Sequence, residues 1–121
     1  MSRVLVVEDN PQNLKLARLV LAKAGFEVLE AGDGEQGVRL AREQLPDLVL
    51  MDVQMPGLDG LGAVRLLRGD PRTAGLKVVA LTAQAMKGDR ERILAAGCDG
   101  YLAKPFDYKE LLATVARVLA G

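Results

Sequence analysis

The sequence predicts an α/β fold in which helices cover both faces of a parallel sheet. Short aliphatic runs alternate with longer stretches of helical periodicity, and this alternation repeats five times along the chain. The first, third and fourth runs are almost continuously apolar, which is typical of parallel strands buried on both faces. Strands that alternate with helices indicate βαβ units with right-handed crossovers. Together these observations predict a three-layer sandwich.

The aliphatic runs define the expected strands. The first, VLVV, and the third, LVLM, contain no polar residue. The second, EVLEA, carries charge and is expected at an edge of the sheet. The expected strands cover residues 4–7, 27–31, 48–51, 78–81 and 100–103.

Helical spacing and capping residues place a helix after each strand. Asn10 is a favourable N-cap and Pro11 suits the first turn, so the first helix is expected from Pro11 to the break at Gly25. Pro46 follows the second helix, and Gly97 ends the fourth. The other expected helices cover residues 35–44, 60–68, 87–96 and 108–119.

Length and charge narrow the classes of function. The 121 residues suit one domain with one hydrophobic core. Lys and Arg number 16, as do Asp and Glu, so bulk charge gives no support for binding to nucleic acid or to a membrane surface. No apolar stretch approaches the roughly 18 residues of a membrane span. The N-terminus has no signal-peptide pattern.

Histidine and cysteine usage narrows the chemistry. The chain has no histidine, which excludes a histidine base, a histidine-ligated zinc site and a histidine phosphodonor within it. Its one cysteine, Cys98, cannot form an intrachain disulfide and is expected to be a small buried side chain. A lone cysteine fits a reducing, cytoplasmic compartment.

Polar side chains follow four of the five expected strands. Glu8 and Asp9 follow the first, Asp52 the third, Thr82 the fourth and Lys104 the fifth. In open α/β sheets, ligands bind outside the carboxyl ends of the strands. We therefore expect these five side chains to converge at one edge of the sheet.

Each of these residues also has a simpler interpretation on its own. Glu8 and Asp9 suit the start of a helix, where acidic groups favour the dipole. Asp52 suits a solvated turn, Thr82 an N-cap of the fourth helix and Lys104 the surface. Only their coincidence at strand ends favours a shared role.

Three carboxylates that lie close together repel one another unless a cation neutralises them. Lys104 supplies one positive charge, which leaves about two negative charges at the site, the number that a divalent cation would neutralise. An all-oxygen site favours Mg²⁺, and Mn²⁺ less specifically. A metal, a lysine and a hydroxyl around a carboxylate suit phosphoryl transfer, with Asp52 as the nucleophile and Lys104 and Thr82 holding the transferred oxygens.

Four segments resemble the receiver domain of two-component response regulators. They are VLVVEDN at 4–10, LVLMDVQMPGLDG at 48–60, VVALTA at 78–83 and GYLAKPF at 100–106. The resemblance spans residues 3–119 and implies a flavodoxin-like (βα)5 sandwich with a parallel five-stranded sheet of order 2-1-3-4-5. It predicts that residues 1–121 form one receiver domain without an output domain.

The resemblance also implies a role for each matching residue. Asp52 matches the phosphoacceptor and Asp9 a direct Mg²⁺ ligand. Glu8 matches a ligand that acts through water, and Gln54 one that uses its backbone carbonyl. Gln54 and Gln84 stand where the family tunes the lifetime of the phosphoryl group.

Further matches concern the switch. Lys104 matches the family's lysine, and the Lys104–Pro105 bond is a candidate cis peptide. Thr82 matches the switch hydroxyl and Tyr101 the aromatic that changes rotamer, so that the face of the fourth helix, fifth strand and fifth helix responds to phosphorylation.

The implied function is that of a cytoplasmic single-domain regulator. It receives a phosphoryl group from a histidine kinase or a histidine phosphotransfer protein and acts through a downstream protein. It catalyses only its own phosphorylation and dephosphorylation, binds neither DNA nor membrane, and is a monomer or weak dimer. The segment ALTAQAMKGD at 80–89 resembles stand-alone regulators of the cell-polarity and cell-cycle type, or receivers fused to hybrid histidine kinases, and we rank the stand-alone regulator first.

Four alternatives remain open at this stage. The chain could be a receiver fragment of a hybrid histidine kinase, or a pseudo-receiver that binds partners independently of phosphorylation. A phosphatase-like hydrolase would usually have an acid at position 54, where this chain has Gln54. A flavin-binding module of the same fold lacks support, because no glycine-rich loop follows the first strand. The sequence does not identify the kinase, the target or the pathway.

Overall fold

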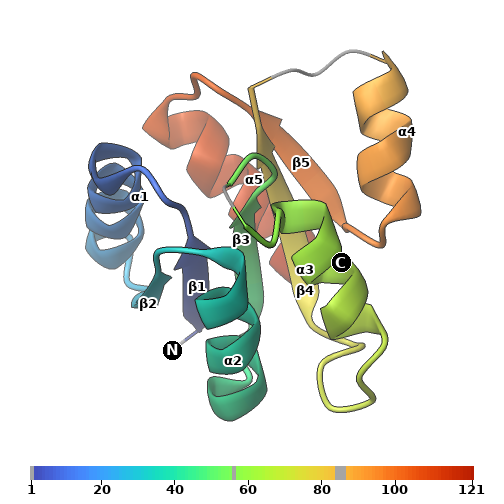
Figure 1. Cartoon of the computed structure of the whole chain (residues 1–121). Coiled ribbons are helices and arrows are strands. Elements are labelled where there is room, and N and C mark those ends of the chain that lie inside the picture. The colour runs from blue at the N-terminus through green and yellow to red at the C-terminus, as the bar shows by residue number, and fades with distance from the viewer. Residues whose placement is uncertain (1, 56, 84–86) are drawn as a thin grey trace.

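A computed structural model describes residues 2–55, 57–83 and 87–121 of the chain. It contains a parallel five-stranded sheet in the order β2-β1-β3-β4-β5, as expected (Figure 1). The strands are β1 (Arg3–Val7), β2 (Glu27–Ala31), β3 (Leu48–Asp52), β4 (Lys77–Thr82) and β5 (Gly100–Ala103). The helices are α1 (Pro11–Lys23), α2 (Gly34–Gln44), α3 (Gly60–Arg68), α4 (Lys87–Ala95) and α5 (Tyr108–Ala120).

Helices cover both faces of the sheet, which confirms the three-layer sandwich. Side chains alternate along each central strand, so β1 and β3 contribute to two separate apolar layers. One layer joins Val4 and Leu50 to Leu21 of α1 and Val115 of α5. The other layer lies under α2, α3 and α4 and includes the buried side chains Leu5, Val7, Val49, Met51, Val38, Val64 and Ile93.

The ends of the elements lie within one or two residues of those expected. β3 and β4 each continue one residue beyond the apolar run, to Asp52 and Thr82. The reason is that strand pairing continues there: Asp52 pairs with Leu81, and Thr82 pairs with Ala103. α1 ends at Lys23, just before the expected break at Gly25.

Short polar side chains fix the starts of helices at the carboxyl edge of the sheet. The side chain of Asn10 accepts hydrogen bonds from the backbone amides of Gln12 and Asn13, which confirms the expected N-cap. Aspartates perform the same function at the starts of α2, α3 and α5, namely Asp33, Asp59 and Asp107.

Gly60 allows α3 to begin directly against the end of β3. A Cβ atom at position 60 would lie 2.0 Å from the carbonyl oxygen of Asp52, far inside van der Waals contact. Only glycine permits this approach. The start of α3 therefore fixes the backbone that carries Asp52.

Within residues 2–55, 57–83 and 87–121, no helix has the length and apolar character needed to cross a bilayer.

Candidate functional site

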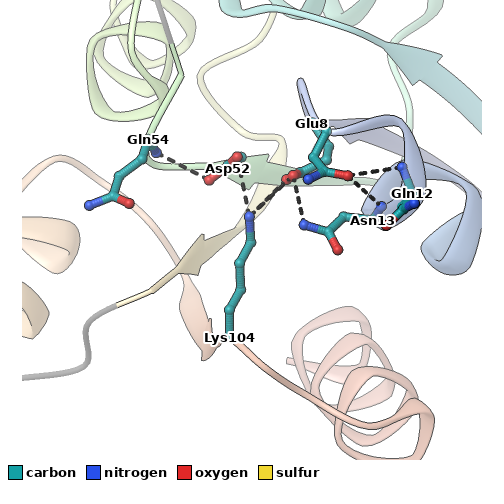
Figure 2. Close-up of polar contacts among 7 residues, drawn as sticks. Glu8, Gln12, Asn13, Asp52, Gln54 and Lys104 are labelled. Atoms are coloured by element: carbon teal, nitrogen blue, oxygen red, sulfur yellow. Dashed lines mark hydrogen bonds and ion pairs between the residues drawn. The ribbon is translucent and has the colours of Figure 1, made fainter.

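The expected polar side chains converge at the carboxyl edge of the sheet. Glu8, Asp52 and Thr82 are buried there, with 2%, 3% and 4% of their surface exposed. Asp9 is exposed beside them. Figure 2 shows the side chains of Glu8, Asp52 and Lys104 pointing toward one another from separate strand ends.

Lys104 faces two of these carboxylates. Its Nζ lies 3.2 and 3.1 Å from the two carboxylate oxygens of Glu8, and 3.3 Å from Oδ2 of Asp52 (Figure 2). Its backbone amide donates to the carbonyl oxygen of Thr82 at 2.7 Å. The Lys104–Pro105 peptide bond is cis, as the resemblance implied. The alternative interpretation of Lys104 as an ordinary surface lysine is therefore wrong.

The other simple interpretations also fail. Asp52 is buried rather than solvated in a turn. Glu8 and Asp9 precede the N-cap Asn10, and the first turn of α1 contains no acidic residue. Thr82 belongs to β4, where it pairs with Ala103 of β5.

The three carboxylates form a group that suits a hard cation. Glu8, Asp9 and Asp52 each offer an oxygen, and these oxygens lie within 4.8 Å of one another. Oxygen donors at this spacing, with one side open to solvent through Asp9, fit Mg²⁺ and its retained waters. The donor set therefore fits the metal that the sequence predicted.

Two neighbours hold the acidic side chains in place. The backbone amide of Gln54 donates to Oδ1 of Asp52 at 3.1 Å. Asn13 Nδ2 of α1 donates to Oε1 of Glu8 at 3.2 Å (Figure 2). Sequence reasoning missed Asn13, since only the position of α1 relative to Glu8 brings it there.

The environment raises the pKa of the Asp52 carboxyl above its ordinary value. Burial is the main cause, and the adjacent Glu8 carboxyl raises it further. The amide of Gln54 and the charge of Lys104 act in the opposite direction. A negative charge at Asp52 therefore needs more compensation than Lys104 alone provides.

Thr82 and Tyr101 lie on neighbouring strands beside this group. Thr82 follows Leu81, the residue that pairs with Asp52. Tyr101 is half-buried and pairs with Ala80 of β4. The roles of both as a switch remain a prediction, as does that of the Gln54 carbonyl. Gln84 lies outside the described residues.

Two cavities flank the site. One of about 420 Å³ is lined by residues of α1 and of the segment after β5, including Asn13, Leu16, Lys104 and Phe106. The other, of about 440 Å³, lies beside Gln54 and extends to Arg92 of α4. The first cavity is lined by Lys104, which contacts the acidic group, and the second by Gln54, which binds Asp52 through its backbone amide.

The family model of the response regulator receiver domain matches residues 4–116. Among curated proteins, the polar-differentiation response regulator DivK of Brucella anthropi is 40% identical over 116 residues, which cover 96% of this chain and 94% of that protein.

Solved structures of receiver domains and response regulators also match this chain. The receiver domain of a sensor histidine kinase of Pseudomonas aeruginosa, with a magnesium ion coordinated in its active site cleft, is 41% identical. It matches with a TM-score of 0.92 over 99% of this chain and 98% of that one. Chemotaxis protein CheY4 of Vibrio cholerae is 30% identical, with a TM-score of 0.93 over 98% of both chains.

Proposed function

This chain belongs to the response regulator receiver domain family, and from that premise we propose that Asp52 is the side chain that accepts the phosphoryl group. The domain is a signalling module of two-component systems, and its pocket of Glu8, Asp9 and Asp52 is compatible with Mg²⁺ and with aspartate phosphorylation. One observation carries the assignment to Asp52. Asp52 is a buried carboxylate at the end of β3 that belongs to the acidic group, lies 3.3 Å from the ammonium of Lys104 and accepts a hydrogen bond from the backbone amide of Gln54.

The proposed transfer proceeds from a phosphorylated histidine of the donor. An oxygen of Asp52 attacks the phosphorus, and the bond from phosphorus to the histidine nitrogen breaks with its electron pair going to nitrogen. No general base is needed, because the attacking carboxylate is ionised. Lys104 compensates charge on the transferred oxygens, and the hydroxyl of Thr82 donates a hydrogen bond to one of them.

Glu8, Asp9, Asp52 and the carbonyl of Gln54 would hold Mg²⁺, or Mn²⁺ in its place. The ion supplies positive charge that stabilises the phosphoryl oxygens in the transition state. The raised pKa of Asp52 supports this need for a cation, because the carboxylate must be ionised to attack.

Receiver domains interact with histidine kinases or phosphotransfer proteins and with downstream targets. For this chain we propose that α4, β5 and α5 form the face that reads out phosphorylation, with Thr82 and Tyr101 as the coupling residues. The proposal extends to a cytoplasmic single-domain regulator, monomeric or weakly dimeric, that catalyses only its own phosphorylation and dephosphorylation.

Incubation with phosphoramidate and Mg²⁺, followed by intact mass measurement, tests the assignment. We expect one phosphoryl adduct on the wild type, none on Asp52→Asn and none with EDTA. Asp107→Asn is the matched control, because asparagine retains the N-cap of α5 and Asp107 is exposed. An adduct on Asp52→Asn, or none on the wild type, would contradict the proposal and favour a pseudo-receiver.

A receiver within a hybrid histidine kinase is the second candidate. The 41% identity to a receiver domain from a sensor histidine kinase favours it. Detection of the endogenous protein with an antibody against this domain separates the two, because a hybrid kinase migrates at a much higher mass than a single receiver.

A further inference from the structure

α4 is attached to the rest of the domain by few buried side chains. Among its described side chains, Ile93 is fully buried, and the next buried residue is Ala96, just beyond the helix. Leu94 is 53% exposed. Figure 1 shows α4 at the rim of the molecule, beside β5. A helix attached in this way depends strongly on each additional contact with the sheet.

One such contact joins Arg90 of α4 to Tyr101 of β5. The guanidinium carbon of Arg90 lies 5.9 Å from the centroid of the Tyr101 ring. The ring is half-buried and packs against the same apolar layer as Ile93. A guanidinium over an aromatic face is attracted by the negative charge distribution of the ring. Arg90 thus favours the position of the Tyr101 ring in this structure.

We propose that Arg90 is a positioning residue of the switch: it holds Tyr101 in its unphosphorylated position and couples that position to the attachment of α4. The inference rests on the proposed function, in which phosphorylation of Asp52 moves Tyr101 by way of Thr82. A ring that leaves this position loses its contact with Arg90. Arg90 therefore opposes the movement of the Tyr101 ring. When the ring moves, α4 loses this contact with β5.

Reciprocity gives this proposal a measurable consequence. An interaction made only in the unphosphorylated state lowers the affinity of the domain for every ligand that favours the phosphorylated state. Removal of the Arg90 side chain should therefore tighten the binding of a phosphoryl analogue at Asp52. The expected change is about two- to fivefold, the range of an exposed cation–π contact.

The chain contains its own control for this contact. It has two tyrosines, and the second, Tyr108, has the ammonium of Lys109 at 6.0 Å from its ring centroid. Both residues are exposed at the start of α5. Lys109→Gln therefore removes one positive charge and one cation–π contact without touching Tyr101.

Fluorine spectra of protein labelled with 3-fluorotyrosine test the contact without metal. Tyr108→Phe assigns the two resonances. We expect Arg90→Gln to shift the Tyr101 resonance, and Lys109→Gln to shift only that of Tyr108. A Tyr101 resonance that does not move in Arg90→Gln would overturn the proposal.

Titration with beryllofluoride at fixed Mg²⁺ tests the coupling, with the fluorine signal of the bound analogue as readout. We expect half-saturation at two- to fivefold lower concentration in Arg90→Gln and no change in Lys109→Gln. In a Tyr101→Ala background, Arg90→Gln should no longer matter. An unchanged or higher midpoint in Arg90→Gln overturns the inference about Arg90 but not the proposed function. The same holds if Arg90→Gln lowers the midpoint equally in the Tyr101→Ala background. A wild type that fails to bind the analogue contradicts the proposed function and the switch together.

Discussion

The ammonium group of Lys104 faces two buried carboxylates and leaves their charge incompletely compensated. It lies within 3.3 Å of both Glu8 and Asp52, while Asp9 adds a third negative charge nearby. Burial and Glu8 together raise the pKa of Asp52. Without a divalent cation, the ionised site is therefore electrostatically unfavourable in the folded protein.

Asp52→Asn should consequently stabilise the metal-free protein. The change removes a charge that the folded state disfavours, and the amide fills nearly the same volume. We expect the free energy of unfolding at neutral pH in EDTA to rise by about 1 kcal/mol, the usual scale for one buried polar group. Urea titration of both proteins provides the measurement. A less stable variant would show that Lys104 already compensates Asp52 fully.

Cys98 should be inert in the folded protein. Burial raises the pKa of its thiol to about 11, from an ordinary 9.0. A raised pKa means that the folded state favours the thiol. The resulting stability is present below the ordinary pKa and is lost as pH rises through about 11. At pH 8 the thiolate is about a hundredfold scarcer than in the unfolded chain.

Alkylation by iodoacetamide at pH 8, followed by intact mass, measures this difference. We expect slow modification of the native protein and rapid modification in urea. Equal rates would mean that Cys98 is accessible and ionises normally.

On the scale of elements, Arg68 connects three segments through its guanidinium. Nε and Nη2 donate to the carbonyl oxygen of Gly97 at 2.9 and 2.7 Å, and Nη2 also reaches Asp99 at 3.0 Å. Nη1 donates to the carbonyl oxygens of Ala74 and Leu76. The end of α3 is thereby joined to the segments before β4 and β5.

Arg68→Lys should destabilise the domain although it preserves the charge. An ammonium cannot reproduce the planar set of donors, so carbonyl groups lose their partners. We expect a loss of about 1–3 kcal/mol in the free energy of unfolding, measured in urea. Arg65→Lys, an exposed position on the same helix, is the control and should change stability little. Similar losses in both variants would contradict the proposed role of Arg68.

The elements themselves could be predicted from the sequence, because their signals are local. Apolar runs, the N-cap Asn10 and the break at Gly25 depend on neighbouring residues alone. The strand ends at Asp52 and Thr82 could not be placed, since pairing with the adjacent strand extends them past the apolar run. The hydrogen bonds of the Arg68 guanidinium could not be predicted either, because its partners lie up to 31 residues away in the sequence.

For the whole molecule, the strand order explains why the site could be anticipated. Parallel strands bring their carboxyl ends to one edge, so the polar residues that follow the apolar runs had to converge there, namely Glu8, Asp52, Thr82 and Lys104. Their individual pairings were not predictable. That Lys104 contacts Glu8 as well as Asp52 depends on side-chain geometry across the sheet.

Mg²⁺ should stabilise the domain as one cooperative unit, because its expected ligands come from different strands. At a hundredfold excess over the dissociation constant, a ligand of the native state adds about 2.7 kcal/mol to the free energy of unfolding. We expect a smaller gain in Asp9→Asn at the same Mg²⁺ concentration. Asp47→Asn, before the start of β3 at the opposite edge, should keep the full gain. Thermal unfolding followed by circular dichroism measures all three, and an equal gain in Asp9→Asn would exclude Asp9 as a ligand.

The close contact between Gly60 and the backbone of Asp52 limits which positions can be changed in protein engineering. Because a Cβ there would collide with the backbone of Asp52, residue 60 is a fixed point in any redesign of the loop between β3 and α3. Gly75 is exposed and a Cβ there would meet no atom within 4 Å, so position 75 could accept a substituted side chain that carries a label. A biosensor built from this domain should therefore carry its reporter near Gly75 and leave Gly60 untouched.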